Sequence, residues 1–233
     1  MNELRRAAVA VLIAVAVQAA SATEPPAQIL EAGVGIAVAA DGSVAAVAPE
    51  PGLPSGLSQA LIKAVSEWRF TPATWHGKRV AVQEWMPLRL QPVPTTSGGY
   101  AIRILGRGSK PMPGMDMHPP AFPRMAQRAG ASAALVYRVH VDREGSMSPV
   151  ARLYPKALEG YLESFDASLL RAIAQSRRPP VTANGLPVAC DFRIPYMFVG
   201  EDVVEPPKRP DLLSIDNECP KATLETRIKD ALL

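Results

Sequence analysis

The chain has 233 residues, of which 48% are hydrophobic and 20% charged, a composition typical of soluble globular proteins that excludes disorder and collagen-like structure. Its length allows one large domain or two small ones. Lys and Arg number 25 and Asp and Glu 22, a net charge of +3, and without a basic run this small excess gives nucleic-acid binding little support. The 24 prolines fall in clusters and are about twice the usual share, which indicates punctuation between folded pieces.

The N-terminus is typical of an export signal. Two arginines, Arg5 and Arg6, precede an uncharged stretch that ends in the Ala-x-Ala cleavage pattern at Ala22. A membrane-spanning helix needs about 20 apolar residues, and this stretch is shorter and includes the polar Gln18 and Ser21. We therefore expect residues 1–22 to be a signal peptide that is cleaved on export to the periplasm. The alternative is that they are retained as an inner-membrane anchor.

Two cysteines, Cys190 and Cys219, form a candidate disulfide, because export places them in an oxidising compartment. Such a bond would tie the C-terminal tail to the second half of the chain. One buried and one exposed thiol remain an alternative, since the sequence supplies no geometry. A catalytic thiol is not expected, because the sequence suggests no nearby histidine.

The chain contains two copies of one pattern. Apolar, proline and glycine residues that start at Leu57 recur from Phe165 at a constant offset of 108 positions without a gap. The matches include Pro87 with Pro195 and the turn glycines Gly77 with Gly185. Upstream, the turn dipeptide Asp41-Gly42 corresponds to Glu144-Gly145.

Each copy predicts the order strand, strand, helix, strand. Alternation of apolar residues indicates the strands, and apolar residues at helical spacing from Leu57 and from Phe165 indicate a helix in each copy. We expect Pro72 and Pro179-Pro180 to end these helices, because proline lacks the N–H that a helix needs. The expected strands are 34–38, 44–48 and 80–90 in the first copy and 135–141, 148–154 and 188–198 in the second.

The fold class is therefore α+β, with two tandem units that are each a small three-stranded antiparallel sheet packed with one helix (β-β-α-β). A tail of extended chain and a short terminal helix is expected after the second unit. The boundaries are 1–22 for the signal peptide, 23–95 for the first unit, 96–115 for a linker rich in Pro, Gly and Met, 116–200 for the second unit and 201–233 for the tail.

A family resemblance is carried by the residues around the helices. The first helix is followed by Trp68-Arg69-Phe70-Thr71-Pro72-Ala73 and a Gly77-Lys78 turn. In the second copy, Phe122-Pro123 precedes the first strand, and Ser176 and Arg178 stand at the Trp and Phe positions. With these residues both copies resemble the C-terminal domain of TonB, the periplasmic end of an energy transducer, and the second copy is degenerate.

The resemblance implies a partner and a binding mode. In the family, the last strand of the unit lies at a sheet edge and receives a short extended segment of a TonB-dependent receptor. An open edge exposes N–H and C=O groups that such a segment completes. Pro87 and Pro195 each lack a donor, which favours an edge position and also blunts the pairing surface. The expected partner-binding residues are Val82, Trp85, Leu88, Arg89, Arg193 and Tyr196.

Other candidate residues are expected to be structural. Trp68 and Phe70 close a core, Pro72 ends the first helix, and Gly77 and Gly185 form turns. The side chains of Met112, Met115, Met117 and His118 are soft ligands suited to Cu(I). They lie in a Pro-Gly-rich stretch without a cysteine, so neither a metal site nor a cofactor is predicted. The sequence contains no recognised catalytic motif, and no enzyme is expected.

The leading hypothesis is a periplasmic, non-catalytic protein that binds protein or peptide partners by edge-strand pairing. One alternative is a membrane-anchored, atypical energy transducer, although the N-terminal apolar stretch lacks an ionisable group that could couple to a proton motor. A further alternative is a structural protein that self-associates, for example as a homodimer, so that its sheet edges pair with each other.

Overall fold

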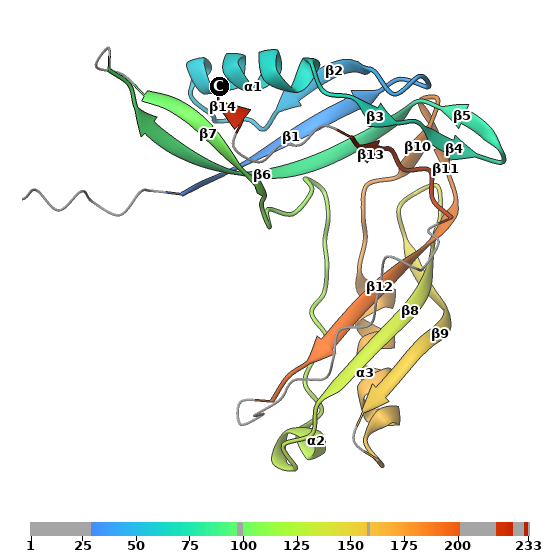
Figure 1. The fold of residues 1–233 in the computed structure, drawn as a ribbon. Helices are drawn as coiled ribbons and strands as arrows, with labels where there is room; N and C mark the ends of the chain where they lie inside the picture. Colours follow the sequence, from blue (N-terminus) through green and yellow to red (C-terminus); the bar gives the residue numbers. More distant parts are fainter. Residues whose placement is uncertain (1–28, 97–99, 158, 201–217, 226–230, 233) are drawn as a thin grey trace, which may run out of the picture.

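The computed structural model describes residues 29–96, 100–157, 159–200, 218–225 and 231–232 (Figure 1). The expected signal peptide, residues 1–22, lies outside this range, as does most of the expected tail. The fold is mixed α+β, with many antiparallel strands and few helices. No helix in the described residues is long and apolar enough to cross a membrane.

The first sheet has five antiparallel strands in the order β14-β7-β6-β1-β2. Helix α1 (Ser55–Ser66) lies on one face of this sheet (Figure 1) and buries Leu61 and Val65 against the core. Val34 and Ile36 lie on the same face of strand β1 and fill the core from the sheet side. The strands are β1 (Leu30–Val38), β2 (Val44–Pro49), β6 (Val82–Pro94), β7 (Tyr100–Arg107) and β14 (Ala231–Leu232).

Helix α1 ends at Ser66, well before the expected stop at Pro72. The reason is that Trp68 and Phe70 turn back into the core, where they are 4% and 3% exposed. The chain continues through β3 (Phe70–Thr71) and a short hairpin of β4 (Ala73–Trp75) and β5 (Lys78–Val80). Trp68 and Phe70 thus lie in the core, where they were expected. Gly77 lies in the turn between β4 and β5 with a positive φ of 74°.

A strand, β7 (Tyr100–Arg107), occupies part of the segment 96–115 that was expected to be a linker. Strand β7 pairs with β6 from Arg107 opposite Leu88 to Tyr100 opposite Pro94. Its Ile104 side chain is fully buried in the first core. The prolines near the end of β6 indicated that the strand would stop before them. Strand β6 nevertheless continues as far as Pro94, because its last residues pair with β7.

The second sheet has three antiparallel strands in the order β12-β8-β9. Helix α3 (Leu162–Gln175) covers one face, with Phe165 and Leu169 in a core shared with Phe198. The strands are β8 (Ala133–Val141), β9 (Met147–Ala157) and β12 (Cys190–Phe198), preceded by the short helix α2 (Arg124–Arg128) and interrupted by a hairpin of β10 (Val181–Ala183) and β11 (Leu186–Val188).

The two halves use the same backbone device at equivalent turns. Gly42 and Gly145 both adopt a φ of 87°, which is the left-handed region that glycine adopts without strain. The carbonyl of Gly42 accepts the N–H of Phe70 at 2.9 Å, and that of Gly145 accepts the N–H of Arg178 at 3.0 Å. A Cβ at either glycine would lie 1.9 Å from the carbonyl oxygen of Phe70 or Arg178, so these turns require glycine.

Contacts between the halves are made by the second hairpin and by the C-terminal chain. The N–H of Asn184 donates to the carbonyl of Ala81 at 2.8 Å, and its side-chain oxygen accepts the N–H of Ala81 at 2.9 Å. Ala183 is buried in the first core, while Trp75 packs against both cores. The second sheet therefore projects from the side of the first sheet that α1 does not cover (Figure 1).

Residues 218–225, which we call the strap, join the two halves a second time. Cys219 forms a disulfide with Cys190 of β12. The N–H of Ala222 donates to the Glu84 carboxylate of β6 at 2.8 Å. Where a terminal helix was expected, the described residues form two short strands, β13 (Thr223–Leu224), which pairs with β3, and β14, which pairs with β7.

Candidate functional site

Strand β6 does not offer the long open edge that the sequence suggested. It pairs with β1 on one flank and, from Leu88 onward, with β7 on the other. Val82 and Leu88 are 4% and 0% exposed in the first core. Arg89 lies in the doubly paired part of the strand. The expectation that Leu88 and Arg89 meet an incoming strand is thus corrected, because β7 already occupies that flank.

Trp85, another expected partner-binding residue, holds a segment of its own chain. Its indole N–H donates to the carbonyl of Lys110 at 3.3 Å. The ring lies across Gly33, where an added Cβ would be 1.9 Å from it. Lys110 also pairs with Glu50 at 2.5 Å. Trp85 therefore fixes the chain that leaves β7 against the face of the first sheet opposite α1.

Strand β12 has an open flank within the described residues, because its only strand partner there is β8. The carbonyl of Asp191 accepts the N–H groups of Glu218 and Cys219 at 3.1 and 3.2 Å, so it points away from β8. In an antiparallel ladder this orientation alternates, and Arg193 and Met197 consequently direct their N–H and C=O groups outward as well. Neither backbone has another described partner on that side.

Pro195 belongs to the same outward-facing series. It offers a carbonyl but no donor, so it interrupts the row of groups between Arg193 and Met197. The open flank can accept a visiting backbone at three residues and donate to it at two. A proline at this position is compatible with an edge and would be costly in an interior strand.

A groove of about 210 Å³ lies beside this flank. One wall is α3, and the other is β12 with Ile194 and Tyr196. The expected partner-binding residue Tyr196 therefore lines the groove, whereas the alternation of the strand places Arg193 on the other face. The remaining lining residues are Met117, His118, Pro119, Pro120, Leu169, Ala172, Ile173 and Ser176.

The groove exists partly because Ser176 is small. Ser176 is 1% exposed and occupies the position at which the first copy has the core residue Trp68. Its hydroxyl donates to the carbonyl of Ala172 at 2.7 Å and accepts the N–H of His118 at 2.9 Å. The chain around His118 thus packs into space that an indole would fill, and it forms one rim of the groove.

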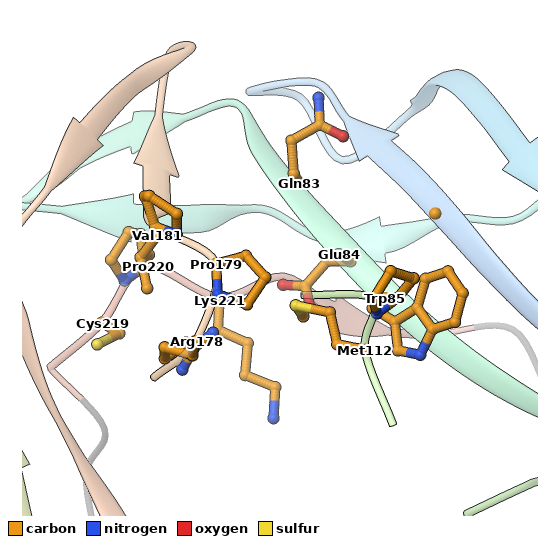
Figure 2. A pocket seen from close by; sticks show the side chains of 13 residues that line it. Gln83, Glu84, Trp85, Met112, Arg178, Pro179, Val181, Cys219, Pro220 and Lys221 are labelled. Atoms are coloured by element: carbon orange, nitrogen blue, oxygen red, sulfur yellow. The ribbon is translucent and has the colours of Figure 1, made fainter. Parts of the chain in front are cut away.

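A second cavity, of about 340 Å³, lies between the halves (Figure 2). Strand β6 contributes three neighbours, Gln83, Glu84 and Trp85, and Gly35 of β1 adjoins them. The strap contributes its residues from Cys219 to Lys221. The remaining lining residues are Met112, Pro113, Arg178, Pro179, Pro180 and Val181.

Two ionisable groups of this cavity are held in a desolvated setting. Burial raises the pKa of Glu84, although the N–H of Ala222 and the nearby cations Lys221, Arg107 and Arg178 oppose the shift. Burial lowers the pKa of Arg178, and the charge of Glu84 opposes this shift. The Arg178 guanidinium carbon lies 5.1 Å from the centre of the Phe192 ring, which is a cation–π distance.

The methionine segment contributes residues to both cavities. Met112 lines the cavity between the halves, whereas Met117 and His118 line the groove beside β12. No group of three or more His, Cys, Asp and Glu side chains suited to a metal ion occurs in the part of the chain that the structure describes.

Sequence reasoning did not select Ser176 and Arg178 as functional candidates, although each lines one of the two cavities. The available signal was their departure from the repeat, since they replace Trp68 and Phe70. Comparison with known proteins found no match among family models, curated proteins or solved structures.

Proposed function

We propose that this chain is a periplasmic, non-catalytic binding protein of two tandem TonB C-terminal-like units that takes up an extended segment of a partner protein by strand addition at β12. The observation that carries the proposal is the open flank of β12 beside an apolar groove. Main-chain pairing gives affinity with little demand on sequence, and a pocket for alternate side chains gives selectivity.

The resemblance to TonB rests on the residues of the repeat and is supported by their positions. Trp68 and Phe70 fill a core behind a helix. The last long strand of the second half lies at a sheet edge within the described residues, as the proposed family plan requires. The first half differs, because β7 covers its corresponding strand, and we therefore assign binding to the second half alone.

The geometry of β12 favours a short segment. Arg193 and Met197 each offer one donor and one acceptor, while Pro195 offers an acceptor only. An incoming strand would place alternate side chains on the α3 side, next to Ile194 and Tyr196, where the groove lies. Residues of the segment on the other face would lie beside Arg193. Periplasmic segments of TonB-dependent receptors are the partner class we propose.

A periplasmic location is supported by the disulfide between Cys190 and Cys219, since such bonds persist in oxidising compartments. Export also agrees with the proposed signal peptide over residues 1–22. N-terminal sequencing of the exported protein separates this proposal from the anchored alternative, because a mature chain that begins at Thr23 has lost the anchor.

The binding test is a titration of the mature protein with peptides that span the periplasmic segments of TonB-dependent receptors. A Met197→Pro variant removes one outward donor of β12, and Met197→Ala is its matched control, because it retains that donor. We expect Met197→Pro to weaken binding by tenfold or more and Met197→Ala to change it little. Circular dichroism establishes that both variants fold. Equal binding by both variants, or no binding by the folded native chain, contradicts the proposal.

The same open flank supports a second candidate, self-association by pairing of β12 with its copy in another chain. Light scattering over a range of protein concentrations tests it. A stable dimer that Met197→Pro converts to a monomer would favour this structural role over peptide binding, because the flank would already be occupied.

A further inference from the structure

We propose that the cavity between the halves is a second binding site, which takes the C-terminal end of an extended peptide and holds its carboxylate with Arg178. This site is separate from the flank of β12, and it does not depend on the function proposed above. Three features carry the inference: an arginine that forms no ion pair with a described carboxylate, an open stretch of β6 and an apolar lining.

The first feature is the state of Arg178. Its Nε atom is buried and has no hydrogen-bond partner, and the side chain forms no ion pair with a described carboxylate. The guanidinium carbon lies 5.1 Å from the centre of the Phe192 ring. A partly buried guanidinium without an ion-pair partner is unfavourable, whereas a carboxylate ligand would pair with it through charge-assisted hydrogen bonds.

The surrounding charges favour an anion. The charged residues that line the cavity are Arg178, Lys221 and Glu84. Glu84 is the one carboxylate among them, and burial of its own side chain raises its pKa. Its oxygen is also engaged by the N–H of Ala222. Cations therefore outnumber anions around the cavity.

The second feature is a short free stretch on β6. The carbonyl of Pro87 accepts the N–H of Gly108 at 2.8 Å, so it points away from β1. By the alternation of an antiparallel ladder, Gln83 and Trp85 direct their N–H and C=O groups the same way. Strand β7 pairs with β6 only from Leu88 onward, and neither Gln83 nor Trp85 has a described backbone partner on this flank.

The third feature is the lining and size. Met112, Pro113, Val181 and Pro220 give the cavity apolar walls. The volume of about 340 Å³ lies at the low end of ligand pockets, which span roughly 300–1,000 Å³, and suits the last few residues of a chain. Backbone pairing with Gln83 and Trp85 would orient such an end, which makes a peptide a better match than an isolated acid.

Comparison of the two copies shows that Arg178 replaces a core residue of the first copy. Arg178 stands where the first copy has Phe70, and both residues make the same backbone bond to a turn glycine. Phe70 is 3% exposed in its core. An arginine at the equivalent place instead lines the cavity between the halves, so the position has changed from core packing to a charged wall.

The test uses the mature, disulfide-bonded chain and two probes, N-acetyl-Ala-Val-Leu with a free carboxylate and the same peptide as its C-terminal amide. We expect the acid to bind in calorimetry and to shift the backbone amide resonances of Gln83 and Trp85, and the amide to bind at least tenfold more weakly. Arg178→Met should abolish this difference. Arg177→Met is the matched control, because Arg177 is an exposed neighbour outside the lining.

Several outcomes overturn the proposal: no binding of the acid, equal binding of acid and amide, or unchanged preference for the acid in Arg178→Met. If Arg178→Met does not fold, Lys221→Met on the exposed strap replaces it and should weaken the preference for the acid. Acetate that binds as tightly as the peptide shows an anion site only and overturns the peptide assignment. Met197→Pro should leave this binding unchanged, which separates it from the function proposed for β12.

Discussion

At the scale of single residues, two substitutions within the repeat shape both cavities. Trp68 and Phe70 fill the first core. At the equivalent positions of the second half, Ser176 leaves room for the chain around His118, and Arg178 lines the cavity between the halves. The two cavities therefore arise where the second copy departs from the core-forming pattern of the first.

Glu84 predicts a pH dependence of stability. Burial raises its pKa in the folded state, so the folded protein holds this proton more tightly than the unfolded chain. Glu84 contributes its full stabilisation at pH values below its pKa in the unfolded chain. This stabilisation is lost as the pH rises through the pKa of Glu84 in the folded protein. Relative to Glu84→Gln, the native protein should lose unfolding free energy as the pH is raised from 4 towards 8.

Urea unfolding at several pH values measures this difference. Glutamine keeps an oxygen that can accept the N–H of Ala222, so the comparison isolates the charge. The contributions of Asp41 and Asp142, whose pKa values are lowered by hydrogen bonds, are common to both proteins and cancel. A difference that does not vary with pH, or that grows in the opposite direction, contradicts the burial of the Glu84 carboxylate.

At the scale of secondary-structure elements, the main departure from expectation is β7. It extends the first sheet over residues that were expected to be a linker and covers the flank of β6 from Leu88 onward. Its role in the core predicts that Ile104→Ala destabilises the protein. Because Ile104 is 0% exposed, the loss should be about 2–4 kcal/mol, as for other large-to-small changes in cores.

Denaturant unfolding measures this loss, with Leu186→Ala as the control. Leu186 is an exposed strand residue of similar size, 69% accessible, so its truncation should cost less than about 1 kcal/mol. Equal and small effects of the two substitutions would mean that Tyr100–Arg107 behaves as a linker after all.

The sequence predicts an element well when the residues that specify it are close together in the chain. Local periodicity and turn chemistry indicated β1, β2, α1 and their counterparts in the second half, because each pattern lies within a few consecutive residues. Strands β13 and β14 instead depend on pairing with segments that are far away in the sequence. Strand β7 pairs with β6, which directly precedes it, but the prolines at the end of β6 favoured a linker there. No local pattern specifies the pairing of β13 and β14, so the sequence did not predict these two strands.

The candidate site was predicted in part for the same reason. The alternation around Tyr196 indicated a last strand, and in the structure this residue lines the groove beside an open flank. The equivalent reasoning misplaced Leu88 and Arg89, because the residues of the covering strand β7 were expected to be a linker. Trp85 is held by the carbonyl of Lys110, a contact that its own neighbourhood does not reveal.

At the scale of the whole molecule, the strap holds the two halves together. It is bonded covalently to β12 through Cys190 and Cys219 and non-covalently to the first half through Glu84 and β3. The disulfide closes a loop over a sequence separation of 29 residues. Closure of a loop of this size stabilises a folded protein by about 2–4 kcal/mol.

Removal of this disulfide should therefore lower the unfolding free energy by about 2–4 kcal/mol. Urea unfolding of the native protein with and without reductant tests this, and hydrogen exchange at the Ala222 amide should become faster when the strap is released. The double variant Cys190→Ala with Cys219→Ala is the control and should not respond to reductant. Unchanged exchange at Ala222 after reduction would contradict the coupling between the strap and the first half.

The open flank of β12 is tested most directly by hydrogen exchange at single amides. In the monomeric protein without ligand, the outward amides of Arg193 and Met197 should exchange rapidly, while those of Ile194 and Tyr196, which face β8, are protected. A bound receptor peptide should protect Arg193 and Met197. Slow exchange of both amides in the free monomer, or no added protection at a saturating concentration of a bound peptide, would contradict strand addition at β12.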